Sequence, residues 1–256
     1  MKIFDTHAHY DDAKFDEDRE DLLKKIYDFG VKKYVNVGCD IDTSKKSIEL
    51  ANTHNFIYAS CGIHPSEIKE EYIEQIKEIE KLAQNDKVVA IGEIGLDYHW
   101  DKENKELQKE VFLKQIDIAN KLKLPIIIHT REAIQDTINI LKKCKLKSGG
   151  ILHCCPFNKD LVETGLEAGL YIAFGGTCTF KNSKNASEII EIVPIEKMLV
   201  ETDSPYLAPE PKRGTRNDSR NLEFIINKIA EVKNIPSEEV ANKTFENAIK
   251  IFQIKE

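Results

Sequence analysis

Several features that mark other classes of protein are missing from this sequence. No stretch approaches the roughly 20 consecutive apolar residues of a membrane-spanning helix, and residues 1–5 (MKIFD) lack the apolar core of a signal peptide. We therefore expect a soluble, cytoplasmic protein with no membrane partner. Runs rich in proline, glycine or serine are also lacking, so no linker divides the chain. Residues 1–256 are expected to form a single domain.

Cysteine spacing and charge argue against two further classes. The 6 cysteines lack the spacing of a zinc ribbon, and several lie in apolar runs where a thiol packs as a small hydrophobic group, so we expect no disulfide framework. The formal net charge of -7 argues against a protein that coats duplex nucleic acid through a basic face. A nuclease remains compatible with this charge, because bound cations and a local basic loop can hold a phosphate.

Short runs rich in valine and isoleucine alternate with amphipathic helical segments along the chain. The expected strands are residues 3–9, 33–38, 57–63, 88–95, 125–130, 150–154, 171–176 and 198–203. The expected helices lie near residues 17–29, 42–54, 70–84, 103–122, 132–143, 158–168, 183–192 and 221–233. Eight such units predict an α/β fold with parallel strands, closed into a (β/α)8 TIM-type barrel. A last helix, near residues 237–252, would pack outside it.

Six side chains of metal-ligand type stand at the ends of these strands. His7 and His9 are two residues apart, so a strand points both imidazoles to one face. Glu93, His129, His153 and Asp203 each close another apolar run. Barrels of this class build their active sites at the C-terminal ends of the strands. Imidazole and carboxylate are the ligands of hydrolytic divalent-metal sites, so the pattern predicts a metal-dependent hydrolase.

Five segments of the chain resemble the signature segments of the TatD-type metal-dependent deoxyribonucleases, a family of the amidohydrolase superfamily. They are IFDTHAH (3–9), GIHP (62–65), GEIGLDY (92–98), IHTREA (128–133) and VETDSPYL (200–207). The resemblance covers essentially the whole chain, in order. It implies a TIM-type barrel, two divalent metal ions and hydrolysis of DNA phosphodiesters, often from the 3′ end. Carried over by position, the ligands are His7, His9, Glu93, His129, His153 and Asp203.

The chemistry of these residue types suggests how two ions would be shared. Glu93 suits a bridge, because each carboxylate oxygen can bind one ion. We assign His7 and His9, with Glu93 and Asp203, to one ion. His129 and His153, with Glu93, are assigned to the other. Asp203 is also a candidate base for the attacking water. This ligand set suits zinc, manganese, iron and, less well, magnesium, and it does not choose among them.

Further residues are candidates for contacts with a substrate. His64 follows a strand end and is a candidate catalytic residue at a phosphate or leaving group; the alternative is a plain loop histidine. Arg131 shares the parity of His129 and is placed to reach a phosphate or Glu201. Arg213 and Arg216 lie in a basic loop, residues 212–217, that is placed to hold a phosphate backbone, although a solvated turn is the alternative.

Two acidic residues have two interpretations each. Asp5 and Glu201 lie two residues before a ligand, so they either orient histidines or form a polar network with Arg131. The chain also departs from the family: HCCPF (153–157) replaces a usual His-Cys-Phe-Ser-Gly, and Arg216-Asn217-Asp218-Ser219 replaces a usual Arg-Asn-Glu-Pro. The ligands are untouched by these changes. These changes put in question the substrate contacts of the loop after the sixth strand.

The sequence thus predicts a dinuclear metal-dependent hydrolase that cleaves DNA phosphodiester bonds, exonucleolytically from 3′ ends. Its partner would be single-stranded or frayed DNA ends, and no protein partner is implied. The alternative keeps the site but hydrolyses an ester or amide, such as an aminoacyl-tRNA ester or a cyclic amide. A third interpretation, a metal-stabilised scaffold, fits less well, because structural metal sites are closed and usually need four ligands.

Overall fold

Eight parallel strands form one sheet in chain order, from β1 to β8, in a computed structural model that describes residues 1–255. β1 and β8 meet through a parallel bridge between Ala8 and Ser204, and the His9 N–H donates to the Ser204 carbonyl at 2.7 Å, which nearly closes the barrel. The strands are β1 (Ile3–Ala8), β2 (Val31–Val37), β3 (Ile57–Cys61), β4 (Val88–Asp97), β5 (Ile126–Arg131), β6 (Gly150–Leu152), β7 (Leu170–Phe174) and β8 (Met198–Val200). The predicted single-domain (β/α)8 barrel is confirmed.

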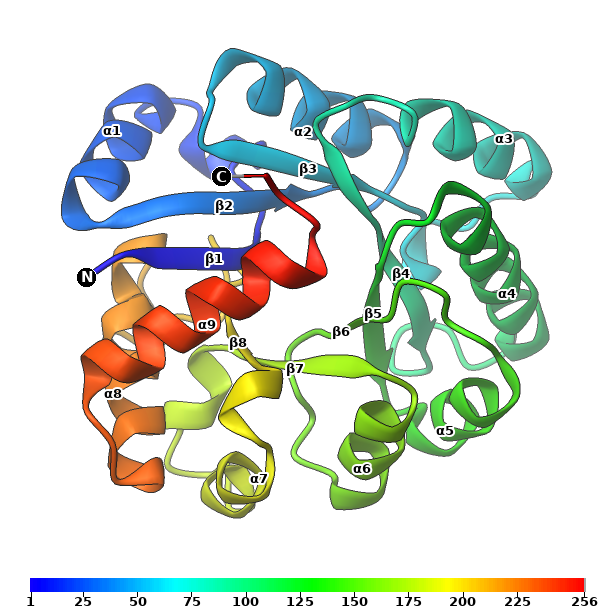
Figure 1. Ribbon diagram of the computed structural model, residues 1–256. Helices are drawn as coiled ribbons and strands as arrows, with labels where there is room; N and C mark the ends of the chain where they lie inside the picture. The colour runs from blue at the N-terminus through cyan, green and yellow to red at the C-terminus, as the bar shows by residue number, and fades with distance from the viewer. Residues whose placement is uncertain (256) are drawn as a thin grey trace.

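One helix follows each strand and packs on the outside of the barrel (Figure 1). These helices are α1 (Arg19–Phe29), α2 (Ile41–Thr53), α3 (Tyr72–Leu82), α4 (Lys105–Leu122), α5 (Ile134–Lys143), α6 (Lys159–Glu167), α7 (Ala186–Ile192) and α8 (Leu222–Lys233). Local sequence sets their starts. Asp40 forms a capping box with Thr43 at the start of α2, and Asn158 accepts from the Leu161 N–H at the start of α6.

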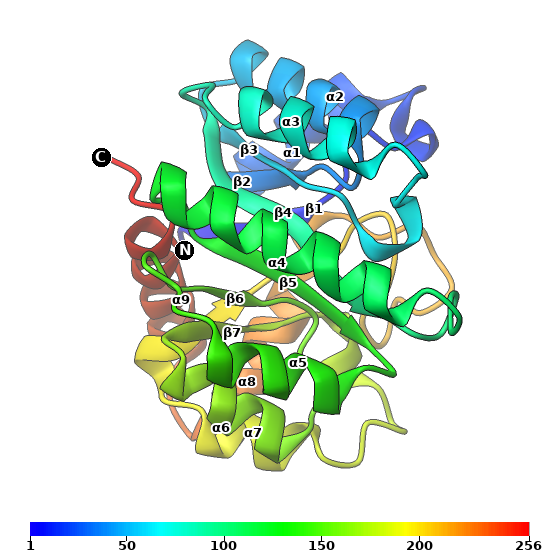
Figure 2. The same cartoon turned by 90° about the vertical axis from the view of Figure 1, so that its right-hand side faces the viewer.

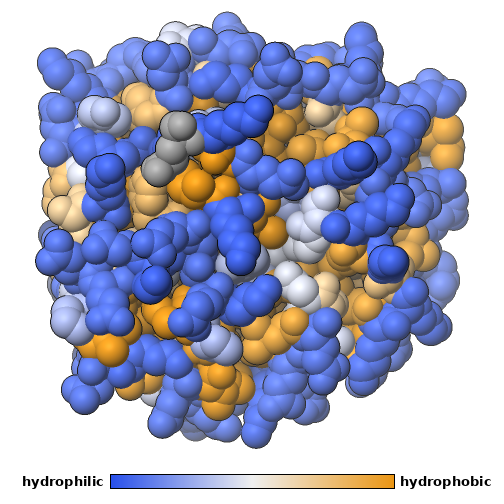
Figure 3. Space-filling model, in the orientation of Figure 1, coloured by the Kyte–Doolittle hydropathy of each residue, from blue (hydrophilic) through white to orange (hydrophobic). Residues whose placement is uncertain are grey.

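A ninth helix, α9 (Ser237–Ile251), has a different position from the one that the sequence suggested. We expected it to pack outside the barrel, but it covers the N-terminal opening, in front of the strands in Figure 1. Phe245 and Phe252 pack against Phe4, with ring centroids 5.9 Å and 5.7 Å away. Figure 3 looks on to this end, where hydrophilic residues cover most of the face and hydrophobic ones show between them. The helix therefore completes the floor of the barrel core.

The strand ends at the opposite face are free for function. In Figure 2 they point away from α9 and from both termini. β6 and β8 are shorter than expected, so His153 and Asp203 lie just beyond the strands. Among residues 1–255, no helix combines the length and the apolar character that crossing a membrane requires.

Candidate metal centre

The six predicted ligands converge at the C-terminal end of the barrel. His7, Glu93 and His129 lie within strands, whereas His9, His153 and Asp203 lie just past strand ends. Loop hydrogen bonds fix the last of these: the Asp203 N–H donates to the His7 carbonyl at 2.9 Å, and the Asp203 carbonyl accepts from the Tyr206 N–H at 2.8 Å. Asp203 has a φ of 57°, a conformation that side-chain-bearing residues adopt mainly where the surroundings hold them.

Glu93 lies at the middle of the cluster, and its two oxygens face different histidines. Oε1 is 2.8 Å from Nδ1 of His129 and 3.7 Å from Nε2 of His153. Oε2 is 3.4 Å from Nε2 of His7. The carboxylate therefore separates two groups of imidazoles. This is the arrangement that a carboxylate bridging two cations requires.

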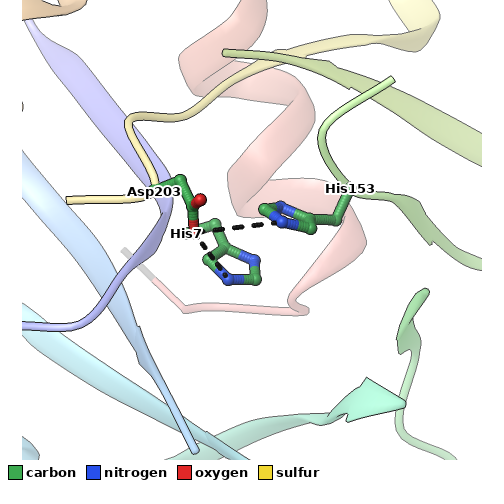
Figure 4. A group of neighbouring side chains, drawn as sticks. All are labelled: His7, His153 and Asp203. Carbon is green, nitrogen blue, oxygen red and sulfur yellow. Dashed lines mark ion pairs between the residues drawn. The ribbon is translucent and has the colours of Figure 1, made fainter. Parts of the chain in front are cut away.

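Asp203 completes the group around His7 and His9. Its Oδ1 is 3.3 Å from Nε2 of His9, 3.7 Å from Nε2 of His7 and 4.0 Å from Nε2 of His153. Figure 4 shows the carboxylate turned toward the rings of His7 and His153. These two rings are stacked, with centroids 3.6 Å apart. His153 thus lies between the two groups, in contact with both carboxylates.

The donor atoms present fit divalent cations. Ligand atoms of His7, His9 and Glu93 lie within 4.8 Å of one another, and so do those of His64, Glu93 and His129. Nε2 of His7 and Nε2 of His9 face each other at 3.1 Å. Two imidazoles cannot both present a proton at that separation, whereas both lone pairs can point to a common cation. Neutral nitrogen and carboxylate oxygen are the donors that zinc, manganese and iron accept.

The electrostatics show which groups hold protons when no cation is bound. Burial opposes the charged form of Glu93, but the charges of His153 and His7 outweigh it and hold its pKa well below its usual value. Burial likewise acts to lower the pKa of His129, yet hydrogen bonds to Asp97 and Glu93 raise it to about 9. Burial of His153 is outweighed by the charges of Glu201 and Glu93, which raise its pKa to about 9. The cluster therefore stores protons that a cation must displace.

A second layer of groups orients the imidazoles. Glu201 contacts His153, with Oε1 2.9 Å from Nδ1, and accepts from the Cys154 N–H at 2.6 Å. Nδ1 of His9 lies 2.9 Å from the Val37 carbonyl. Such partners set the tautomer and direction of a ligand. Of the two interpretations of Glu201, the structure supports the one in which it orients a histidine.

Asp5 has a different position. It is buried and accepts from the Thr202 and Ser219 hydroxyls, each at 2.6 Å, and from the backbone N–H groups of Thr202 and His7. It therefore joins β1 to the segments after β8 rather than contacting an imidazole. Burial raises its pKa to about 7.

Two residues beside the ligands were missed by the sequence argument. Asp97 Oδ2 lies 2.9 Å from Nε2 of His129, and Cys39 Sγ lies 3.8 Å from Oε2 of Glu93. A signal for Asp97 existed, because it lies four residues after Glu93 at the end of the same strand and so shares its parity. Cys39 follows β2 and carries no such pattern.

His64 is brought to the edge of the cluster. Its Nε2 is 3.9 Å from Oε1 of Glu93, and its Nδ1 lies 2.8 Å from the Ser66 hydroxyl. Burial lowers its pKa to about 4, so the ring is neutral near pH 7. The structure thus places His64 beside the candidate ligands, and its catalytic role stays a prediction.

The three predicted arginines have separate surroundings. The exposed Arg131 guanidinium lies 5.5 Å from the ring centroid of Trp100. Arg216 donates two hydrogen bonds to Asp18, at 2.8 Å and 2.6 Å, and one to the Lys14 carbonyl. Arg213 lies 4.0 Å from the centroid of the Phe180 ring, and no acid among residues 1–255 pairs with it. Arg131 and Arg213 are therefore the two whose charge is not matched by a carboxylate.

Comparison with known proteins identifies similar chains. The sequence profile of the family described as "TatD related DNase" matches residues 4–253, which include all six candidate ligands. YabD of Bacillus subtilis (strain 168), an "uncharacterized metal-dependent hydrolase", is 41% identical over 253 residues, covering 98% of this chain and 99% of the relative. YcfH of Escherichia coli (strain K12), described in the same words, is 34% identical and covers 99% and 97%. The crystal structure of YJJV, a TatD homolog from Escherichia coli K12, superposes with a TM-score of 0.92 at 26% identity, covering 99% and 98%.

Proposed function

The chain belongs to the TatD-related DNase family of metal-dependent hydrolases, and from that premise we propose that it hydrolyses DNA phosphodiester bonds with two divalent cations. The proposed substrate is the 3′ end of a single-stranded or frayed DNA. The reaction class follows from the site, the choice of DNA rests on the family, and the choice of a strand end rests on the burial of the donor atoms and the formal net charge.

The division of Glu93 between two groups of histidines carries the proposal. One oxygen faces His129 and His153 and the other faces His7, while His153 also reaches Asp203 of the other group. Two bound cations lower the pKa of water and offset the negative charge that develops on phosphate oxygens. Glu93 would hold their separation fixed, while its own negative charge reduces their mutual repulsion.

Asp203 is the proposed proton acceptor. Burial opposes its charged form, but a hydrogen bond with His9 and the charge of His153 lower its pKa, so the carboxylate stays ionised near pH 7. An ionised carboxylate beside the attacking water can take its proton. His64, neutral and 3.9 Å from Glu93, is placed to contact the substrate rather than to hold a charge.

Entry at a strand end follows from the burial of the donor atoms. His7 is fully buried, and Glu93 and His153 are each 5% exposed. A continuous duplex is too wide to lower an internal phosphate on to such recessed atoms, whereas a frayed end can enter. The formal net charge of -7 also repels long DNA, so the bound cations, Arg131 and Arg213 are left to hold the phosphates of the strand end.

The test compares closed circular duplex, linear duplex and single strands labelled at the 3′ or 5′ end, each with several divalent metals. We expect release of nucleotides from the 3′ end of single strands first and no nicking of the circle on that timescale. Nicking of the circle at the same rate would refute end entry. Turnover of an ester or cyclic amide with no cleavage of any DNA would refute DNA as the substrate and favour the alternative hydrolase.

A further inference from the structure

Trp100 is the single tryptophan of the chain, and it lies exposed beside the metal centre. Its side chain is 71% exposed, the most of any large hydrophobic residue among those that the structure describes. It follows β4, so it stands on the same end of the barrel as the ligands. Its exposed indole presents an aromatic face on which a ligand can stack.

The backbone of Trp100 is tied to a metal ligand. Oδ1 of Asp97 accepts from the N–H groups of His99 and Trp100, at 2.9 Å and 3.3 Å, while Oδ2 lies 2.9 Å from His129. Gln108 of α4 donates to the carbonyls of Asp97 and Asp101 and so fixes the next residues. One carboxylate therefore contacts His129 and also holds the backbone at Trp100, which places the indole at this end of the barrel.

The surroundings of Trp100 suit a flat, anionic ligand. The Arg131 guanidinium lies 5.5 Å from the ring centroid and supplies positive charge. Trp100 also lines a hollow whose walls combine the apolar side chains of Pro65, Ile68 and Leu107 with the polar ones of Ser66, Asp101, Asn104 and Gln108; Pro65 directly follows His64 of the metal cluster. An aromatic face with a cation nearby is a feature with which proteins hold a base and its phosphate.

We propose that Trp100 forms a base-stacking subsite at the rim of the metal centre, where it receives the nucleobase next to the scissile phosphate. The inference rests on the proposed function and names the part of the substrate that this surface recognises. Stacking needs only the π-face that every base has, so the subsite reads the presence of a base and not its identity. Trp100 is then a positioning residue, since it holds the end of the strand while the cluster acts on the phosphate.

The kinetic test uses the metal-loaded enzyme and an end-labelled oligothymidylate. Trp100→Ala should raise KM about 5- to 150-fold, the range that loss of one base–aromatic stack produces. Trp100→Phe keeps a ring and should recover most of the loss. Phe29→Ala removes an exposed aromatic residue at the end of α1, away from the ligands, and should leave KM unchanged. A matched oligonucleotide lacking the base next to the scissile phosphate should show no difference between wild type and Trp100→Ala.

A binding test does not need turnover. Because Trp100 is the single tryptophan, its fluorescence reports this position alone. We expect a phosphorothioate-linked oligothymidylate, which resists hydrolysis, to quench it, and the abasic strand to quench it far less.

The outcomes separate the subsite from the proposed function. Cleavage of DNA with an unchanged KM in Trp100→Ala would refute the subsite and leave the proposed function standing. If wild type cleaves no DNA, the proposed function fails, and the fluorescence titration decides the subsite alone: base-dependent quenching supports it and equal signals from the two strands overturn it. Quenching by apolar peptides but not by oligothymidylate would assign the surface to a protein partner and refute the subsite.

Discussion

Binding of metal should release protons in a number that the geometry of the cluster sets. The pKa values of His129 and His153 are raised from 6.5 to about 9, because carboxylates face both rings. At pH 8 each imidazole then carries about 0.9 of a proton, whereas an unperturbed histidine would carry about 0.03. A histidine that binds a metal must be neutral, so binding of metal at His129 and His153 should release about two protons per chain at pH 8.

Calorimetric titration of the metal-free protein with Mn²⁺ measures this number. Repeating the titration at pH 8 in two buffers with different enthalpies of ionisation gives the protons released from the difference in heat. His129→Asn should lower the count by about one. His54→Asn, at the end of α2 and outside the cluster, should leave it unchanged. A wild-type release below about half a proton, or an equal count in His129→Asn, would refute the reasoning.

The same shifts set the direction of two pH dependences. Affinity for metal should increase with pH up to and through about 9, because the competing protons leave over that range. Stability of the metal-free protein should run the other way. A raised pKa in the folded state contributes stability that is fully present below pH 6.5 and is lost as the pH rises through about 9. Thermal melts of metal-free and loaded protein between these values would show the two trends diverging.

Four further variants test the bridging carboxylate, the basic loop and the barrel floor. Glu93→Gln should lower turnover by at least about 10²-fold with an unchanged circular dichroism spectrum, because the bridge loses its charge; near-normal turnover would show that it is not the bridge. Arg213→Ala should raise KM for DNA and reduce the dependence of KM on salt; an unchanged salt slope would place the path of the substrate elsewhere. Arg216→Ala should instead lower thermal stability by about 1 kcal/mol, since the Arg216 guanidinium is paired with Asp18. Phe252→Ala should cost about 3–5 kcal/mol in urea unfolding with kcat unchanged, because the ring is 3% exposed in the barrel floor, and a cost under about 1 kcal/mol would contradict that packing.

The barrel and the convergence of the six candidate ligands were predictable because they depend on periodicity and connectivity. Parallel strands linked by helices place all their C-terminal ends on one face, so His7 and Asp203 meet although 196 positions separate them in the sequence. The alternation of a strand was enough to put His7 and His9 on one side. These signals are local in the sequence, and the barrel topology brings the residues together.

What was missed depends on contacts between distant segments. Nothing near Arg216 in the sequence indicates that Asp18, 198 residues earlier, would pair with it. The amphipathic pattern of α9 predicts a buried face without saying which surface it covers, so its place across the barrel floor could not be read from it. Which oxygen of Glu93 faces which histidine is likewise a matter of side-chain rotation.

The closure of the barrel has a consequence for synthesis on the ribosome. His7 is made early, yet Asp203 comes from the segment after the last strand, and the floor beneath both is completed by Phe252. A nascent chain shorter than 203 residues therefore lacks part of the candidate ligand set, and one shorter than 252 residues lacks a finished core. Until the chain has emerged that far from the exit tunnel, the apolar faces of the strands stay exposed to aggregation.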